Sequence, residues 1–328
     1  MYAQRLALAF ITVLFPVGRA CAQINPCLAR TVPVNVTNER GTAISGLTAD
    51  NFKGSVHHKP IKIISVTPDD APHRVLIVLD ASGSMTGEIR KWQLYVSVAN
   101  NLVESIPTGT RVGLSVFSSK IERHIPFTLD RHELEIELKS LQTVPKAFGK
   151  GSHQTALWDS LATEVSEFSS PLNGDSIYLI SDGGDNASRT QTSELKKILV
   201  EKAIRVFVFS PDRVAGPTPE EQARGLNLIA LVEATGGTIV PAARNAVGEP
   251  IPIVDERGRP TAQQELLLTQ FRQIFGFQRL EIEMPRETSN VSDLKLEIRG
   301  LSARDLVLTF PHELASCAAV VPKAHAAP

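Results

Sequence analysis

Five side chains with oxygen donors stand at or beside the ends of short apolar runs, in three separate stretches of the chain. They are Asp80, Ser82, Ser84, Thr155 and Asp182. Carboxylates and hydroxyls are hard ligands, which suit Mg²⁺ or Mn²⁺ better than metals that prefer thiolate or imidazole. Each stretch alone is a weak signal, because a strand that ends in Asp-x-Ser is commonly a turn with a helix cap. Brought together around one point, the three stretches predict a divalent-cation site with one vertex open to a partner.

The apolar runs have the length and composition of buried strands. They are rich in β-branched and aromatic residues and cover 75–79, 111–117, 177–180, 204–209 and, more briefly, 238–240. Amphipathic stretches lie between them, with apolar residues three and four positions apart from Trp92 to Ile106 and from Leu157 to Phe168. This alternation predicts an α/β fold, a doubly wound and mostly parallel sheet with helices on both faces. The oxygen donors would then lie at the carboxyl edge of the sheet, where ligands bind.

The two flanks show near-strict alternation of apolar and polar side chains, which is typical of antiparallel strands with one exposed face. The alternating stretches are 32–36, 61–63, 280–284, 294–298 and 306–310. We therefore expect the α/β unit to be inserted in a small antiparallel β domain that both flanks build. A helix over 263–275 would lead the chain from one unit to the other, after a Pro- and Gly-rich loop or hairpin.

The expected organisation has five parts. They are a signal peptide (1–22), the first part of the β domain (23–71), the α/β domain (72–240), a loop or linker (241–262), and the connecting helix with the rest of the β domain (263–328). The signal peptide is indicated by Arg5, an apolar run too short to span a bilayer, and a small-x-small site that ends at Ala22. We expect a protein that is secreted, or that lies in the periplasm or cell envelope, with no transmembrane segment after cleavage.

Charge and cysteine content limit the classes of partner that the chain could bind and indicate its redox compartment. The chain has 34 Lys and Arg against 35 Asp and Glu, so it has no basic surplus for nucleic acid or an anionic membrane. Cys27 and Cys317 would remain after cleavage, and an isolated pair in an exported protein favours a disulfide over two free thiols. No cysteine or carboxylate stands at zinc-site spacing from His57, His58 or His73, which we interpret as exposed loop histidines.

The three stretches with oxygen donors resemble the von Willebrand factor type A domain. The matching motifs are Asp80-x-Ser82-x-Ser84, Thr155-Ala-Leu-x-Asp159 and Leu179-Ile-Ser-Asp182-Gly, and the resemblance covers about 72–240. It implies a metal-ion-dependent adhesion site that holds Mg²⁺, Mn²⁺ or Ca²⁺ and binds an acidic side chain of a protein partner without catalysis. Ser82 and Ser84 would ligate the metal directly, and Thr155, Asp80 and Asp182 directly or through water. The flanks are similar to those of exported bacterial proteins of unassigned role.

The loop before Thr155 departs from the family pattern. His153 and Gln154 stand where the family often has two glycines, which makes the approach of Thr155 to the metal less certain. Asp159 is expected to brace its loop rather than to touch the ion. Asp185 and Asn186, which follow the last motif, are expected to serve as turn and cap residues.

Two other functions fit parts of the pattern. In the first, the chain is a structural module in which the metal site is vestigial and the β domain does the binding. In the second, Asp80 is the nucleophile of a magnesium-dependent phosphohydrolase. Such enzymes carry a second aspartate two residues later as general acid, whereas this chain has Ser82, which cannot shuttle a proton near neutral pH. The sequence leaves the oligomeric state and the identity of the partner open.

Overall fold

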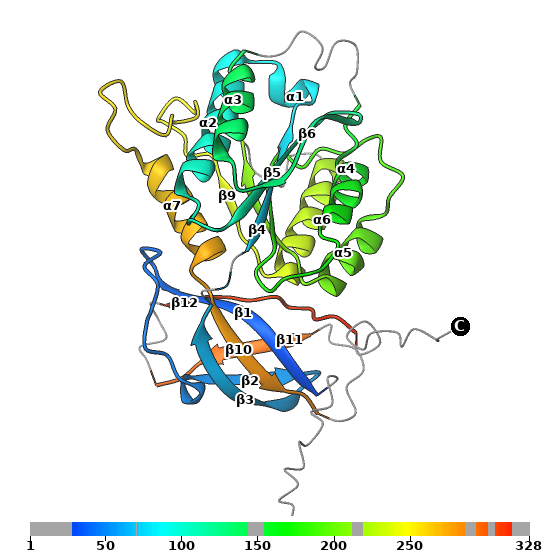
Figure 1. Ribbon diagram of the computed structural model, residues 1–328, viewed down its shortest axis with the longest axis vertical. Helices are drawn as coiled ribbons and strands as arrows, with labels where there is room; N and C mark the ends of the chain where they lie inside the picture. The colour runs from blue at the N-terminus through cyan, green and yellow to red at the C-terminus, as the bar shows by residue number, and fades with distance from the viewer. Residues whose placement is uncertain are drawn as a thin grey trace, which may run out of the picture.

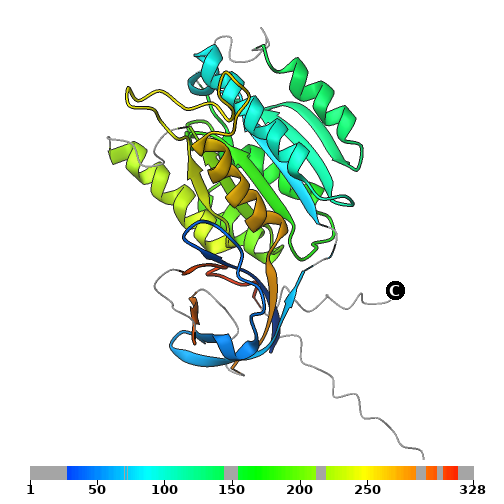
Figure 2. The ribbon, with the colours of Figure 1, turned by 90° about the vertical axis from the view of Figure 1, so that its left-hand side faces the viewer.

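The computed structural model describes residues 28–69, 71, 73–143, 154–211, 219–285, 293–300 and 306–316. Two sheets organise these residues, and they lie at opposite ends of the molecule (Figure 1). One sheet carries helices on both faces, and the other is a curved antiparallel sheet (Figures 1 and 2). The fold class expected from the sequence is thus confirmed. Both cysteines expected to form a disulfide lie outside the described residues, as does the expected signal peptide.

The first sheet has the strand order β6-β5-β4-β7-β8-β9. Its strands are β4 (Arg74–Asp80), β5 (Arg111–Phe117), β6 (Ile121–Thr128), β7 (Ser176–Ile180), β8 (Arg205–Ser210) and β9 (Ile239–Pro241). All neighbours are parallel except β5 and β6. Every residue of β4, β7 and β8 is buried, which explains why these strands have continuous apolar runs rather than alternation.

The helices of this unit are divided between the two faces of the sheet. They are α1 (Gly83–Thr86), α2 (Ile89–Ser105), α3 (Arg131–Ser140), α4 (Leu157–Glu164) with the short 3₁₀ helix η2 (Val165–Glu167), α5 (Thr192–Glu201), α6 (Pro219–Thr235) and α7 (Ala262–Phe275). Apolar residues of α2, α3 and α7 pack with Val75, Ile77 and Leu79 of β4. Those of α4, α5 and α6 pack with Leu76 and Val78, which point to the opposite face.

The antiparallel sheet interleaves strands from the two flanks in the order β11-β2-β3-β10-β1-β12. Its strands are β1 (Ala29–Asn38), β2 (Phe52–Val56), β3 (Lys59–Pro68), β10 (Gln278–Glu283), β11 (Leu294–Ile298) and β12 (Leu306–Thr309), and the 3₁₀ helix η1 (Ala49–Asn51) precedes β2. The central strand β10 pairs with β3 and with β1, so neither flank builds the sheet alone. The apolar side chains of this sheet form one core, which is separate from the two cores on the faces of the parallel sheet.

Three turns repeat one hydrogen-bond pattern. Asn38, Asn245 and Asp255 each accept two backbone N–H groups, from the residues two and four positions later. A glycine with positive φ stands three positions after each of them, where an L side chain would be strained. The last two turns each close a short hairpin between β9 and α7, through the bridges Arg244–Pro250 and Val254–Pro260.

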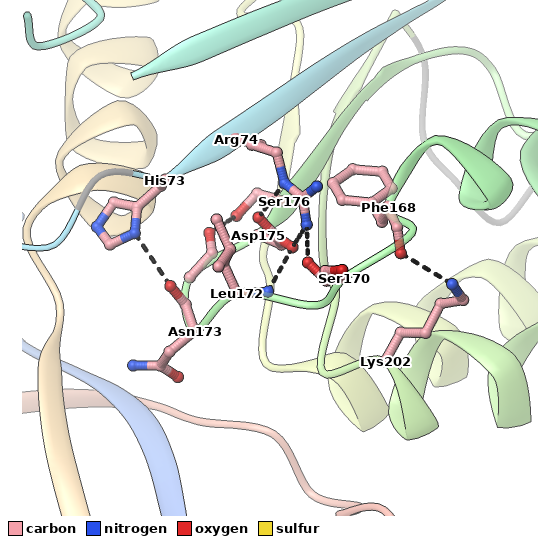
Figure 3. A network of polar contacts seen from close by, with 10 residues as sticks. His73, Arg74, Phe168, Ser170, Leu172, Asn173, Asp175, Ser176 and Lys202 are labelled. Carbon is pink, nitrogen blue, oxygen red and sulfur yellow. Dashed lines mark hydrogen bonds and ion pairs between the residues drawn. The ribbon is translucent and has the colours of Figure 1, made fainter. Parts of the chain in front are cut away.

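A buried ion pair at the amino edge of the parallel sheet ties β4 to the loop before β7 (Figure 3). Arg74 Nε and Nη2 donate to the two carboxylate oxygens of Asp175 at 3.0 and 2.5 Å. Arg74 Nη2 also donates to the Ser170 carbonyl, and the Leu172 N–H donates to Asp175 at 2.8 Å. The guanidinium carbon lies 5.3 Å from the ring centroid of Phe168. Both charges are therefore desolvated, but several polar partners and an aromatic face compensate them.

The expectation that His73 is exposed is wrong. The residue is 5% exposed, its Nδ1 donates to the Asn173 carbonyl at 3.1 Å, and its ring centroid lies 5.0 Å from that of Phe277 (Figure 3). Burial lowers the pKa of His73, and Asp69, Asn173 and Asp175 oppose this shift, whereas the charge of Arg205 adds to it. The neutral imidazole thus fits this junction between the two units. His57 and His58 are exposed as expected.

A second buried arginine connects the two units directly. Arg205, at the start of β8, donates from Nη2 to Asn35 Oδ1 of β1 at 2.6 Å and to the Gln273 carbonyl of α7 at 3.1 Å. Its guanidinium carbon lies 4.7 Å from the ring centroid of Phe207 and 5.0 Å from that of Phe277. Burial lowers its pKa to about 9. Since Phe277 and Asn35 belong to the β unit, Arg205 fixes that unit against the parallel sheet.

Replacing Asp175 with Ala should lower the free energy of unfolding by about 3–5 kcal/mol, because the variant leaves the Arg74 charge buried without its carboxylate. Chemical denaturation of the full chain measures this loss. The matched control is Lys197→Ala, which removes an exposed ion pair with Glu201 on α5 and should cost less than about 1 kcal/mol. Equal losses in the two variants would contradict the importance of the buried pair.

The lowered pKa of His73 predicts a specific dependence of stability on pH. Because the folded state disfavours protonation, stability is lost as the pH falls below about 6.5, the value for an unfolded histidine. His73→Gln cannot be protonated but can still donate to the Asn173 carbonyl. The difference in unfolding free energy between pH 7.5 and pH 5.0 should therefore be smaller in His73→Gln than in the unchanged protein. Identical pH dependence in both proteins would show that His73 does not titrate on unfolding.

Candidate metal centre

Strand register places the candidate ligands at one edge of the parallel sheet. The central strand β4 lies between β5 and β7, with Asp80 opposite Phe117 and Leu79 opposite Ile180. Asp80 is therefore next to Ser181, the residue that follows β7. The strand order reverses between β4 and β7. The loops that follow these two neighbouring strands leave the sheet at this point, which is where ligands bind in open α/β sheets.

Asp80 is the buried centre of this edge. It is fully buried, its Oδ1 accepts the Ser82 N–H at 2.8 Å, and its Oδ2 accepts the Ser181 hydroxyl at 2.7 Å. Burial, and secondly the nearby charge of Asp182, raise the pKa of Asp80 to about 7, although the hydrogen bonds from Ser181 and Ser82 act in the opposite direction. The Asp182 carboxylate thus lies close enough to Asp80 to disfavour its charged form.

The two serines of the first motif lie together at the start of α1. Ser82 is the N-cap residue of this short helix, and its Oγ is 3.1 Å from Ser84 Oγ. Ser82 is buried and Ser84 is exposed, so the pair of hydroxyls extends from the interior to the surface. The Thr86 hydroxyl donates to the Ser82 carbonyl at 2.9 Å and holds the turn.

Asp182 follows β7 after a single serine and is half-buried. Its Oδ1 accepts the Gly184 N–H at 2.8 Å, while the Ser181 hydroxyl accepts the Gly183 N–H at 3.0 Å. Gly183 has a φ of +79°, which an L side chain rarely adopts, so the tight turn requires glycine here. The turn places Asp182 near enough to Asp80 that its charge contributes, after burial, to the raised pKa of Asp80.

Thr155 lies on a segment that crosses the same edge. Its N–H donates to Asn186 Oδ1 at 2.7 Å, and its carbonyl accepts the N–H groups of Asn186 and Ala187. The next N–H, of Ala156, donates to the carbonyl of Ser118, which directly follows β5. Since Asn186 belongs to the loop after β7 and β4 lies between β5 and β7, this segment passes over the end of β4.

The remaining acidic residues brace the loops. Asp185 Oδ1 accepts the Leu157 N–H at 2.9 Å and so caps α4. The Asp159 carboxylate accepts the N–H groups of Arg189 and Thr190. The Thr190 side chain first, and then these N–H groups, lower the pKa of Asp159. The bracing role expected for Asp159 and the capping role expected for Asp185 are thus confirmed, whereas Asn186 anchors the segment of Thr155. His153 lies outside the described residues.

Sequence reasoning missed the supporting function of two serines. Ser181 donates directly to Asp80, and Ser118 anchors the segment of Thr155 through its carbonyl. The role of Ser181 could have been inferred from the sequence, because it stands between a buried strand and Asp182. A buried hydroxyl needs a hydrogen-bond partner, and the end of the neighbouring strand carries the carboxylate of Asp80. For Ser118 the role depends on a backbone carbonyl, which no side-chain pattern reveals.

The donor set fits a hard divalent cation. Across the described ranges no three His, Cys, Asp or Glu side chains gather as a metal cluster. Any ion here would therefore need hydroxyl oxygens in addition to the carboxylates of Asp80 and Asp182. Two carboxylates and three hydroxyls match the preference of Mg²⁺ for oxygen, with several ligands neutral, and a cation would offset the repulsion between the two acids.

Asn186→Ala should destabilise the protein by about 1–2 kcal/mol, because the half-buried N–H of Thr155 would lose its acceptor. Asn100→Ala is the matched control, since the Asn100 side chain donates to Glu104 at 2.7 Å on the exposed side of α2. The control should change the free energy of unfolding by less than about 0.5 kcal/mol. Thermal and chemical denaturation check both values, and an Asn186 variant as stable as the control would contradict the anchoring role.

Comparison with known proteins agrees with this arrangement. Residues 75–185 match the family model of the von Willebrand factor type A domain. No curated protein sequence matches the chain. Similar solved structures include the conserved hypothetical protein BatB from Bacteroides thetaiotaomicron, with 19% identity over 60% of this chain and 96% of that one and a TM-score of 0.42. An aerotolerance-related membrane protein from Bacteroides fragilis has 18% identity over 61% and 98%, with a TM-score of 0.42.

A third similar structure is a von Willebrand factor type A protein from Catenulispora acidiphila, which has 10% identity over 88% of this chain and 74% of that one, with a TM-score of 0.46. At these identities and TM-scores the solved structures do not extend the assignment beyond the matched residues. The motifs quoted from the sequence and the family match cover the same strands and loops. Residues 75–185 of this chain therefore match the von Willebrand factor type A domain in their motifs and in the family model.

Proposed function

We propose that the chain is an exported, non-enzymatic binding module that captures an acidic side chain of a protein partner through a divalent metal ion. Asp80, Ser82, Ser84, Thr155 and Asp182 would hold Mg²⁺, or Mn²⁺ or Ca²⁺, at the carboxyl edge of the sheet. The observation that carries the proposal is the proximity of the buried Asp80 to Asp182 and to the hydroxyls of Ser82 and Ser84. Domains of this family often mediate protein interactions.

Residues of the chain perform distinct tasks in this mechanism. The hydrogen bonds from Ser181 and from the Ser82 N–H fix the Asp80 carboxylate before any ion arrives, so that little ordering is needed on binding. Ser84 is exposed and marks the side from which a partner would approach. A bound metal supplies Lewis acidity toward a carboxylate. With only two acidic ligands, the ion would retain affinity for a third carboxylate from outside.

The proposed location rests on the sequence. The basic residue, short apolar run and small-x-small site of residues 1–22 favour export. Among the helices of the described part, none combines the length and the apolar character needed to cross a membrane.

Metal titration of the full chain tests the centre. At a concentration of 100 times its dissociation constant, Mg²⁺ or Mn²⁺ should stabilise the folded state by about 2.7 kcal/mol and raise the melting temperature, because the ion binds only the assembled site. Asp80→Ala and Ser84→Ala should abolish both the calorimetric heat and this stabilisation, while circular dichroism shows an intact fold. Ser97→Ala, on the exposed side of α2, is the control and should bind metal normally.

The test separates the competing functions. Binding of metal together with EDTA-sensitive capture of protein would support the proposal. Absence of heat and of any melting shift would favour the structural module with a vestigial site. Magnesium-dependent hydrolysis of an aryl phosphate that is lost in Asp80→Asn would favour the phosphohydrolase and contradict a non-enzymatic role.

A further inference from the structure

A groove lies beside the metal centre, between the first turns of α2 and the two hairpins that connect β9 to α7. Its volume is about 560 Å³, which is within the range of ligand pockets. Leu94 and Ile253 are its buried lining residues, and Pro250 and Pro252 make part of its wall rigid. Figures 1 and 2 show the hairpin segment beside the amino-terminal end of α2.

Chain connectivity brings the groove close to the candidate metal centre. Ser84 belongs to α1, and Glu88, the N-cap residue of α2, already lines the groove. The hairpins start where the parallel strand β9 ends, which is the same edge of the sheet that carries Asp80 and Asp182. Burial is the main cause of the raised pKa of Tyr95 on α2, and the charges of Asp182 and Glu88 raise this pKa further. Both acidic residues therefore lie within electrostatic range of the Tyr95 side chain.

The two walls of the groove carry opposite charge. On the α2 wall, Lys91 is paired with Glu88 at 3.0 Å, whereas the exposed Arg90 makes no ion pair with any residue that the structure describes. On the hairpin wall, Glu249 and Glu256 are exposed and likewise form no ion pair within the described ranges. The groove therefore offers one free cation near the metal centre and two free anions across from it.

Exposed apolar side chains occur on the segments that form the groove, and one of them, Val254, lines it. Ile89 is 47% exposed, Val247 79% and Val254 46%, and each lies on one of the two segments that form the walls. Large apolar side chains that gather at an exposed surface mark a site of interaction when polar residues border them. The groove thus combines apolar lining residues with two walls of opposite charge.

We propose that this groove binds the part of the partner that continues from its metal-bound carboxylate. It selects an extended segment in which the acidic residue is followed by a large apolar residue and then by a basic residue. Arg90 attracts the acidic end toward the metal, the apolar side chain packs on Leu94, Ile253 and Val254, and Glu249 and Glu256 bind the basic end. This inference rests on the proposed function, because the metal fixes one end of the segment.

Selection from a phage-displayed library of random twelve-residue peptides tests the inference. The full chain is immobilised, the library is applied in Mn²⁺, and bound phage are eluted with EDTA. The recovered peptides should share the order acidic, apolar, basic. The affinity for a synthetic copy of the recovered peptide is then measured by fluorescence polarisation. Arg90→Glu, Glu256→Lys and Val254→Asp should each lower this affinity about tenfold or more. Arg257→Glu, which lies on the same hairpin but outside the groove, should leave its affinity unchanged.

A charge exchange makes the test specific. A peptide whose basic residue is replaced by Glu should bind Glu256→Lys better than it binds the unchanged protein. Calorimetry with Mn²⁺ alone, on every variant, monitors the metal centre separately, and all groove variants should bind the ion normally. If the unchanged protein binds no Mn²⁺, the proposed function fails. If it binds Mn²⁺ but the recovered peptides lack the motif or ignore the groove substitutions, the groove proposal alone is wrong. If it binds Mn²⁺ but no phage can be recovered with EDTA, metal-dependent capture and the groove proposal both fail.

Discussion

The hydrogen bond between the Ser181 hydroxyl and the Asp80 carboxylate is possible only because β4 and β7 pair in a fixed register. A shift by one residue would turn Asp80 to the other face and replace it with Leu79 or Ala81 at this point. A carboxylate that is fully buried needs such a partner, because an unpaired buried charge would cost more than most single contacts contribute. The candidate metal centre thus depends on strand pairing more than on its loops.

Charged side chains have different kinds of partner at the two edges of the parallel sheet. At the amino edge, Arg74 and Asp175 satisfy each other, and Arg205 is enclosed by carbonyl, amide and aromatic partners. At the carboxyl edge, Asp80 and Asp182 lie together and are compensated by N–H and hydroxyl groups alone. The strongly raised pKa of a carboxylate thus occurs at the carboxyl edge, whereas the amino edge holds one neutralised ion pair and one arginine with polar and aromatic partners.

Much of the fold could be predicted from the sequence because burial on two faces leaves long apolar runs. Strand β6 could not be predicted in this way, since it lies at the edge of the sheet, has three consecutive polar residues at 122–124 and contains Pro126. Helix α3 was also missed, because only Leu134 and Leu138 are buried. His73 looked like a loop residue, and no local pattern reveals that Phe277, some 200 positions later in the chain, packs against it. The positions of Asp80, Ser82 and Ser84 follow from local turns, but that of Thr155 depends on Asn186 and Ser118, which only the tertiary fold brings close.

The interleaved strand order has a consequence for how the protein is made. Among the described strands, β1 pairs with β10 and β12, which follow it by more than 200 residues in the chain, and Thr37 also forms a single bridge to Ala43. A ribosome therefore releases the first strand long before either neighbour exists, and this strand must wait while the whole central domain emerges. Late closure of so long a loop is slow, and the unpaired apolar residues of β1 are exposed to aggregation in the meantime.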